Sequence, residues 1–335
     1  MKVVYVYIGE SKLPAYVLNN LSNTKSRFPE IDMVFISDNT KSLQKVSDLG
    51  VSVWRCKNQA STNSEAMNSM DHPMDFRSGF WFSTLARFFA IEEFMESNSE
   101  NEILQIEADV WLSKNFPFNR FIGLSEELAY PMESVDRGAA SVLYVGSIDA
   151  IKRFNSYCKN ALKESPNSTD MTLLGEYLAD NPDRVLALPT APDESSFKDF
   201  TPQDLAIRSS SSYTHFQGVF DPLTYGMHLF GIDAKNNRGV LKLYSDTPIH
   251  ILDIRKLDFE TLEGEVIGKY RDQRFNIYNL HIHSKNMRIF RNASSQQEIN
   301  KLISTRKKYE ISQLSWGVLA CVILAKVNRW LTQRD

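Results

Sequence analysis

The sequence predicts an α/β fold in which a mainly parallel sheet is covered by helices on both faces. Four apolar segments rich in β-branched and aromatic residues are typical of strands. Segments with apolar residues at helical spacing stand between them. Strands that alternate with helices usually join one parallel sheet, because each helix returns the chain to the same edge. The strands are expected at 2–9, 33–38, 51–56 and 103–110, and the helices at 15–27 and 78–95.

The second half of the chain is less regular. Two apolar segments flank a turn at Asp136–Gly138 and are expected to pair as strands. A segment rich in Ser, Asp and Pro at 190–212 is expected to be an extended loop, and the polar segment 58–68 a mobile loop. The other elements are expected as strands at 128–134, 141–147, 185–189 and 274–285, and as helices at 148–163, 170–180 and 220–233.

The composition excludes several classes of protein. The chain has 335 residues, 42% of them hydrophobic, so it can bury a large core. The formal net charge of -3 gives no field that would attract nucleic acid, and no nucleic-acid partner is expected. The three cysteines, Cys56, Cys158 and Cys321, are far apart, which predicts neither a zinc site nor a disulfide framework. A reducing, cytoplasmic location is therefore expected.

The chain is expected to divide into a main domain, residues 1–290, and a C-terminal helical extension, residues 291–335. No segment reaches the ~18 apolar residues that a membrane-spanning helix needs. The apolar segment after Met-Lys is too short and too poorly flanked for a secretory signal, and is expected to be a first strand. The apolar segment 314–325 has basic residues on both sides. Such a helix either lies on a membrane surface, here the inner face, or packs on the domain, and the sequence leaves both interpretations open.

Two carboxylates close the apolar run ILQIEADVWL. Alternation along a strand places Glu107 and Asp109 on one face, and Leu104, Ile106, Ala108 and Val110 on the other. Two neighbouring carboxylates repel each other and lose hydration, a cost that a cation can offset. Oxygen ligands suit Mg²⁺ or Mn²⁺, which in turn bind diphosphates. The pair therefore predicts a metal site for a nucleotide-diphosphate substrate, with a solvated turn as the alternative.

The phrase LHIHSK supplies a second set of candidate ligands. In an extended segment His281 and His283 share a face, and imidazole is a good ligand for Mn²⁺. Lys285 follows two residues later and could neutralise a departing phosphate. The alternative is a histidine that is hydrogen-bonded in the core.

Three further residues are candidates for contacts with a bound nucleotide. Ligands of parallel α/β sheets bind beyond the carboxyl ends of the strands, where Gly9 and Asp38 are expected. Asp38 could accept a hydrogen bond from a base or ribose, or it could cap the next turn. Arg87 stands in an otherwise apolar helix, where its guanidinium needs an anion. That anion is either a donor phosphate or a carboxylate such as Glu107.

A catalytic base would also be a carboxylate, because transfer to a hydroxyl requires removal of its proton. Asp170, Asp221 and Asp136 are alternative candidates for this role, and the sequence does not choose among them. Asp170 stands at a helix start, so the competing interpretation is that it caps the helix.

In these residues the chain resembles nucleotide-diphospho-sugar glycosyltransferases of the GT-A fold, and among them bacterial enzymes that build surface polysaccharides. Glu107 and Asp109 match the ExD variant of the family's metal-binding DxD motif. The family often carries S-D-x-x-R shortly before that motif, and here Ser83 and Arg87 match while Thr84 replaces the acid. The phrase FDPLTYGMHLFG also looks like such enzymes.

The resemblance implies a Rossmann-like GT-A domain with a nucleotide-sugar-binding half, residues 1–125, and an acceptor-binding half, residues 126–290. It implies Mn²⁺ or Mg²⁺ held by Glu107 and Asp109, with His283 or His281 completing the ligands. It also implies a nucleotide-diphosphate sugar as donor and a glycan or lipid-linked acceptor. Two rivals are a sugar-nucleotide pyrophosphorylase and a non-catalytic carbohydrate-binding protein. The first would carry a Gly-rich basic loop after the first strand, where this chain has GESKLPAY.

Overall fold

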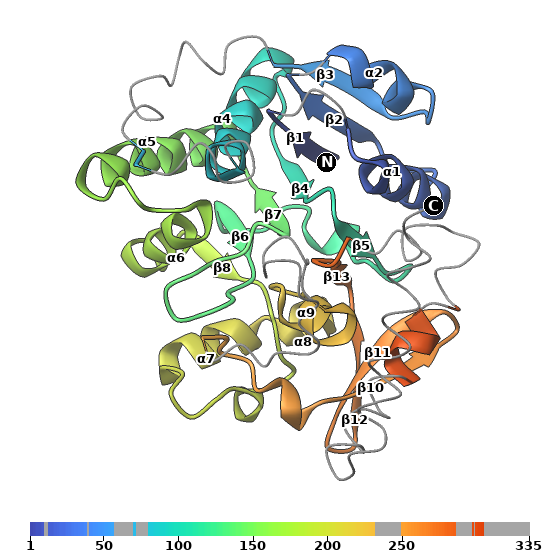
Figure 1. The fold of residues 1–335 in the computed structure, drawn as a ribbon. Helices are drawn as coiled ribbons and strands as arrows, with labels where there is room; N and C mark the ends of the chain where they lie inside the picture. Colours follow the sequence, from blue (N-terminus) through green and yellow to red (C-terminus); the bar gives the residue numbers. More distant parts are fainter. Residues whose placement is uncertain are drawn as a thin grey trace.

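A seven-stranded sheet forms the centre of the molecule (Figure 1). The structure is a computed structural model that describes residues 1–9, 13–38, 40–56, 70–71, 80–231, 249–285, 297 and 299–304. The strand order is β3-β2-β1-β4-β7-β6-β8, and β7 runs antiparallel to the other strands of this sheet. The predicted α/β fold with a mainly parallel sheet is confirmed. The strands are β1 Lys2–Tyr7, β2 Met33–Ser37, β3 Ser52–Arg55, β4 Ile103–Ile106, β6 Leu128–Tyr130, β7 Val142–Val145 and β8 Val185–Ala187.

Helices cover both faces of this sheet. Helix α1 (Ala15–Arg27) packs Val17 and Leu21 against one face, in a core shared with Tyr5 and Phe35. Helices α4 (Phe80–Asn98), α5 (Ile148–Glu164) and α6 (Asp170–Asp180) lie on the other face (Figure 1). Helix α4 contacts β1 and β2 of the sheet on one side and α5 and α6 on others, which explains why apolar residues occur almost all round it.

Two smaller sheets complete the fold. Strand β5 (Val110–Leu112) pairs antiparallel with β13 (Asn279–His281), and His281 stands opposite Val110. The other sheet has the order β10-β11-β12-β9. Its strands are β10 Asp258–Leu262, β11 Glu265–Tyr270, β12 Gln273–Ile277 and β9 Gly218–Val219. The remaining helices with labels in Figure 1 are α2 Thr40–Ser47, α7 Gln203–Ser211, α8 Tyr213–Phe216 and α9 Thr224–Phe230, and short 3₁₀ helices span Phe118–Arg120, Glu194–Ser196 and Ile254–Lys256.

Two of the expected strands are each divided in two, so the expectation of one continuous strand was wrong in both places. The run 103–110 ends as β4 at Ile106, makes a turn, and resumes as β5 in another sheet. The run 274–285 is divided at Tyr278 into β12 and β13. The N–H of Tyr278 donates to Val219, while its carbonyl accepts from Ser113. This residue therefore bonds to two different sheets, which a pattern of apolar residues does not reveal.

The expected loop at 190–212 was also wrong in its second half. Residues Gln203–Ser211 form α7, which begins after Pro202 and carries Asp204 in its first turn. The serines of this segment are typical of loops, so the sequence did not indicate a helix, yet Ser209 is fully buried. Helix α2 was likewise not foreseen.

Parts of the predicted organisation lie outside the described residues, including the segment 58–68 and the apolar segment 314–325. Of the expected extension 291–335, the structure describes residues 297 and 299–304, where Ile299, Leu302 and Ile303 are buried in the main core. Among the described helices, none has the length and hydropathy needed to cross a membrane. The division into two halves and an extension stays a prediction.

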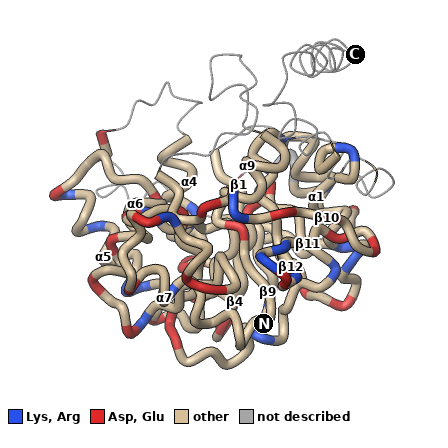
Figure 2. Tube along the Cα trace, turned by 90° about the horizontal axis from the view of Figure 1, so that it is seen from below, with Lys and Arg blue, Asp and Glu red and all other residues tan. Residues whose placement is uncertain are grey.

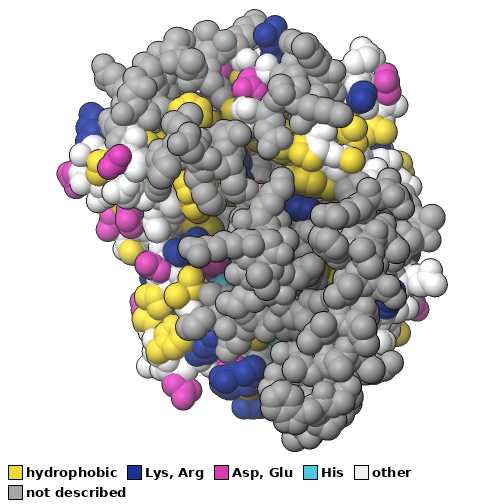
Figure 3. Space-filling view, in the orientation of Figure 1, with side chains coloured by type: hydrophobic (Ala, Val, Ile, Leu, Met, Phe, Trp, Pro, Cys, Tyr) yellow, Lys and Arg dark blue, Asp and Glu magenta, His cyan; other side chains and the backbone are white. Residues whose placement is uncertain are grey.

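The described surface mixes charges of both signs. Acidic and basic residues are interspersed along the chain (Figure 2), in keeping with a formal net charge of -3. Exposed hydrophobic side chains stand among charged ones on the face seen in Figure 3. Phe200 and Ile207, near α7, are examples of exposed apolar residues.

Candidate metal centre

The turn between β4 and β5 carries Glu107 and Asp109, and hydrogen bonds hold its backbone on several sides. The N–H of Val110 donates to the carbonyl of Glu107 at 3.0 Å and closes the turn. The buried Asn20 of α1 donates through Nδ2 to the carbonyls of Ala108 and Val110, at 3.0 and 2.8 Å. The Glu107 N–H donates to the carbonyl of Ser141, the residue before β7, at 3.2 Å. The turn is thereby fixed before any ligand arrives.

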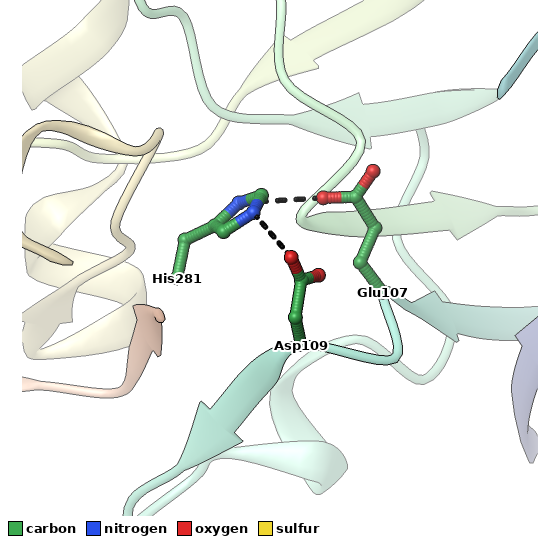
Figure 4. A group of neighbouring side chains, drawn as sticks. All are labelled: Glu107, Asp109 and His281. Carbon is green, nitrogen blue, oxygen red and sulfur yellow. Dashed lines mark hydrogen bonds and ion pairs between the residues drawn. The ribbon is translucent and has the colours of Figure 1, made fainter. Parts of the chain in front are cut away.

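Strand β13 brings His281 to this turn, so that the three side chains point toward one another (Figure 4). His281 Nε2 lies 3.0 Å from Asp109 Oδ2, and His281 Nδ1 lies 3.4 Å from Glu107 Oε2. One candidate ligand atom from each residue lies within 4.8 Å of those from the other two. In an octahedral Mg²⁺ site with bonds near 2.1 Å, adjacent ligands are about 3 Å apart and opposite ones about 4.2 Å. The 3.0 and 3.4 Å contacts involve different nitrogens of the ring, and one ion would bind only one of them. The three candidate ligand atoms, within 4.8 Å of one another, are near enough to gather round such an ion.

The hydrogen bonding of the His281 ring shows why a cation suits this place. The Nδ1 atom is buried and has no hydrogen-bond partner, although a carboxylate oxygen of Glu107 faces it. A neutral imidazole has one N–H, so it can donate to Asp109 or to Glu107 but not to both. The other ring nitrogen then opposes a carboxylate as acceptor against acceptor. A second proton or a metal ion between them removes that conflict.

Two cations flank the acidic pair. Arg87 of α4 forms ion pairs with Glu107 and with Asp170, the latter at 2.6 Å between Nη2 and Oδ2. Lys285 forms an ion pair with Asp109. Burial by itself would raise the pKa of Glu107, but Arg87, followed by His281 and Lys285, more than offsets this and holds the pKa below its ordinary value. The carboxylate is therefore available as a ligand at neutral pH.

The predicted pairing of Arg87 with Glu107 is confirmed, while a contact of Arg87 with a donor phosphate stays a prediction. The interpretation of Asp170 as a helix cap was wrong. Thr169 is the N-cap of α6, because its hydroxyl accepts a hydrogen bond from the N–H of Thr172. In return, the Thr172 hydroxyl accepts one from the N–H of Thr169. Asp170 is the next residue, and its carboxylate faces Arg87. Burial raises the pKa of Asp170 even beside that guanidinium.

The other two base candidates lie in different surroundings. Asp136 is exposed in the β6–β7 turn, where its carboxylate accepts from the Ser134 hydroxyl at 2.7 Å. Asp221 is fully buried, and its carboxylate accepts backbone N–H groups. His283 follows β13, with its ring centroid 6.2 Å from that of His281. It does not belong to the group of described ligand atoms within 4.8 Å.

Gly9 and Asp38 do meet at the carboxyl ends of β1 and β2, as expected. The Gly9 N–H lies 3.2 Å from both carboxylate oxygens of Asp38. Gly9 has φ +92°, and a Cβ there would lie 2.7 Å from the hydroxyl oxygen of Ser83. Glycine is therefore required both for the backbone conformation and for the close approach of α4.

Sequence reasoning missed the residues that hold the ligands in place, chiefly Asn20 and Ser141. Asn20 did leave a signal, because asparagine is a poor former of helix interiors and here it occupies a buried position within α1. Ser141 left none, since its role depends on contacts with residues far away in the sequence.

No known protein-family model matches this chain, and no curated protein matches it. Among solved structures it is similar to mouse xyloside xylosyltransferase 1, with 10% identity over 56% of this chain and 84% of that chain, at a TM-score of 0.42. It is also similar to the galactosyltransferase LgtC in complex with donor and acceptor sugar analogs, with 13% identity over 56% and 73% of the two chains, at a TM-score of 0.41. A third is CMP:2-keto-3-deoxy-manno-octonic acid synthetase with CTP, at 9% identity, 55% and 87% coverage and a TM-score of 0.34. Likenesses this distant carry no argument about the function of this chain.

Proposed function

We propose that this protein is a metal-dependent glycosyltransferase of GT-A type. It would move a sugar from a nucleotide-diphosphate donor to a hydroxyl of a glycan or a lipid-linked acceptor. The observation that carries the proposal is the buried Nδ1 of His281, without a hydrogen-bond partner and opposed by Glu107 across 3.4 Å. Together with Asp109, this arrangement asks for a cation.

The donor set fits Mn²⁺ or Mg²⁺, with Mn²⁺ the better match to an imidazole nitrogen beside carboxylate oxygens. When bound, such an ion supplies Lewis-acid stabilisation of the negative charge on a diphosphate leaving group. Glu107, Asp109 and His281 would hold it. Lys285 forms an ion pair with Asp109, so its ammonium would add positive charge beside the proposed ion.

Arg87 has two roles in the proposal. Its ion pair holds the carboxylate of Glu107 in place. It also adds charge beside the diphosphate. Gly9 and Asp38 stand at the carboxyl edge of the sheet, where the nucleoside of the donor would bind.

The choice of a base is narrowed by geometry. Asp221 accepts four backbone N–H groups, which uses the four lone-pair sites that a carboxylate offers. It therefore has no site left for the proton of an acceptor hydroxyl. Asp170 and Asp136 stay as alternatives if the reaction inverts the sugar, whereas a retaining reaction needs neither.

Calorimetric titration with UDP and GDP, with and without Mn²⁺, tests the proposal. We expect binding of one nucleotide that depends on the metal, and slow metal-dependent hydrolysis of the matching sugar nucleotide. Asp109→Asn keeps the shape of the side chain and should abolish both. Asp136→Asn is a matched control for metal binding, because it removes a carboxylate that lies in an exposed turn.

Nucleotide binding without metal, or no binding at all, would contradict the proposal. Hydrolysis that persists in Asp109→Asn would contradict the assignment of the ligands.

An acceptor at a membrane would fit a cytoplasmic enzyme held at the inner face by the segment 314–325. Sedimentation with vesicles of anionic lipid, before and after removal of that segment, tests this part separately.

A further inference from the structure

The carboxylate of Asp221 accepts four backbone hydrogen bonds. Oδ1 accepts the N–H groups of Leu223 and Tyr225, both at 2.9 Å. Oδ2 accepts the N–H groups of Gly226 and His281, both at 2.8 Å. Three of these donors belong to the start of α9, where N–H groups have no partner within the helix. The fourth belongs to a candidate metal ligand.

The contact with His281 is close because α9 and β13 touch through their backbones. A Cβ at Gly226 would overlap the carbonyl oxygen of His281, so only glycine permits this approach. The same carbonyl accepts the N–H of His283, while the N–H of Ile282 donates to the carbonyl of Asp109 at 2.9 Å. The backbone around His281 is therefore fixed on both sides.

Ser141 connects Asp221 to the other half of the metal centre. Its hydroxyl donates to the backbone carbonyl of Asp221 at 2.8 Å, and its own carbonyl accepts the N–H of Glu107 at 3.2 Å. The side chain of Asn279 also bonds to the backbone of Asp221, both as acceptor and as donor. One short path of hydrogen bonds thus runs from Glu107 through Ser141 and Asp221 to His281.

We propose that Asp221 is a positioning residue that fixes His281 against Glu107 and Asp109 and so sets the affinity of the centre for a divalent metal. This inference rests on the proposed metal site. Asp221 itself touches neither metal nor substrate in this scheme. Its role is to hold the main chain of His281, because the position of that main chain decides whether the imidazole reaches the two carboxylates.

A purely structural role predicts a different result. If Asp221 only caps α9, its loss lowers the stability of the fold but leaves the metal affinity of the folded protein unchanged. Asp221→Asn preserves the shape of the side chain while placing an NH₂ group against backbone donors. The positioning role predicts that this variant raises the Kd for Mn²⁺ about 10- to 100-fold.

The experiment measures Mn²⁺ binding to the full chain by electron paramagnetic resonance of the free ion, with circular dichroism to verify folding. The matched control is Tyr225→Phe, which removes a 2.6 Å bond from the same helix to the carbonyl of Thr190, away from His281. We expect Tyr225→Phe to keep the affinity of the unchanged protein and Asp109→Asn to lose binding. If the Kd of Asp221→Asn for Mn²⁺ stays within about twofold of the value for the unchanged protein, well below a tenfold change, the inference is overturned while the proposed metal site still stands.

If the unchanged protein does not bind Mn²⁺, or if Asp109→Asn binds it fully, the proposed metal site is wrong and this inference is wrong with it. Where Asp221→Asn gives no folded protein, Ser141→Ala decides the matter. That variant removes one hydrogen bond to Asp221 and should raise the Kd by up to about fivefold. An unchanged Kd in folded Ser141→Ala would then overturn the inference.

Discussion

Replacing Arg87 with methionine should leave the buried carboxylate of Asp170 and the partly buried carboxylate of Glu107 without this guanidinium. The side chain of Arg87 is only 7% exposed, and it lies between Glu107 and Asp170, whose side chains are 19% and 6% exposed. Methionine keeps much of the length and apolar character of the arginine stem, so few packing contacts are lost. The change therefore isolates the charge.

The expected fall in stability follows from the burial of this ion pair. Removal of one partner from a buried ion pair costs about 3–5 kcal/mol, because the remaining charge is left without compensation. An unfolding entropy of about 2.1 cal/mol/K per residue gives roughly 0.7 kcal/mol/K for this 335-residue chain. The expected fall in Tm is then about 4–7 °C, measured by circular dichroism at pH 7 without metal.

A second substitution supplies the control. In the Arg87→Met background, Asp170→Asn removes one of the two carboxylates that have lost the guanidinium, so it should reverse part of the fall in Tm. In the unchanged protein the same Asp170→Asn change breaks an ion pair and should lower the Tm. A melting curve for Arg87→Met within about 1 °C of the unchanged protein would refute the reasoning, since it corresponds to less than about 1 kcal/mol. Opposite signs of the Asp170 effect in the two backgrounds are the required outcome.

Three further predictions concern the surroundings of the site. Gly9→Ala should lower the free energy of unfolding by about 1–2 kcal/mol in urea and more than Gly50→Ala, because both glycines have positive φ but only Gly9 has a neighbour within 4 Å. Asn20→Ala should lower the free energy of unfolding by about 1–3 kcal/mol in the same assay, since it removes the amide donor from two buried carbonyls of the turn that carries Glu107 and Asp109. Equal stability would contradict the role given to this amide. The lowered pKa of Glu107 contributes stability that is present above its unfolded pKa of about 4.3 and is lost as the pH falls through the folded value. Glu107→Gln should therefore flatten the fall in Tm below a pH of about 4.3, and an unchanged acid slope in the metal-free protein would count against the pairing.

Elements with strong local signals could be predicted from the sequence. Helix α6 begins at Asp170 and ends at Asp180 as expected, because the start of a helix is decided largely by nearby residues such as Thr169. The β6–β7 pair was found from its turn. By contrast, α7 was missed because its serines are typical of loops, and burial of Ser209 and Ser210 outweighs that tendency.

The candidate site was only partly predictable. Glu107, Asp109 and His281 were all named from the sequence, and the structure brings them together. Their support could not be foreseen, since Asn20 and Asp221 act through hydrogen bonds to backbone groups that are distant in the sequence. The same limit applies to Asp221, one of the three candidate bases: the sequence shows its carboxylate but not the four backbone amides around it.

The candidate metal centre joins residues that stand 172 positions apart, and three residue pairs connect β13 to β5. A growing chain can therefore complete most of its large sheet on the ribosome while still lacking an imidazole for the ion. Competence to bind the cation would arrive late, when the docking of one short strand finishes the centre. A polypeptide released before β13 would lack the third candidate ligand, and it would also lack the buried core residues Leu280 and Ile282.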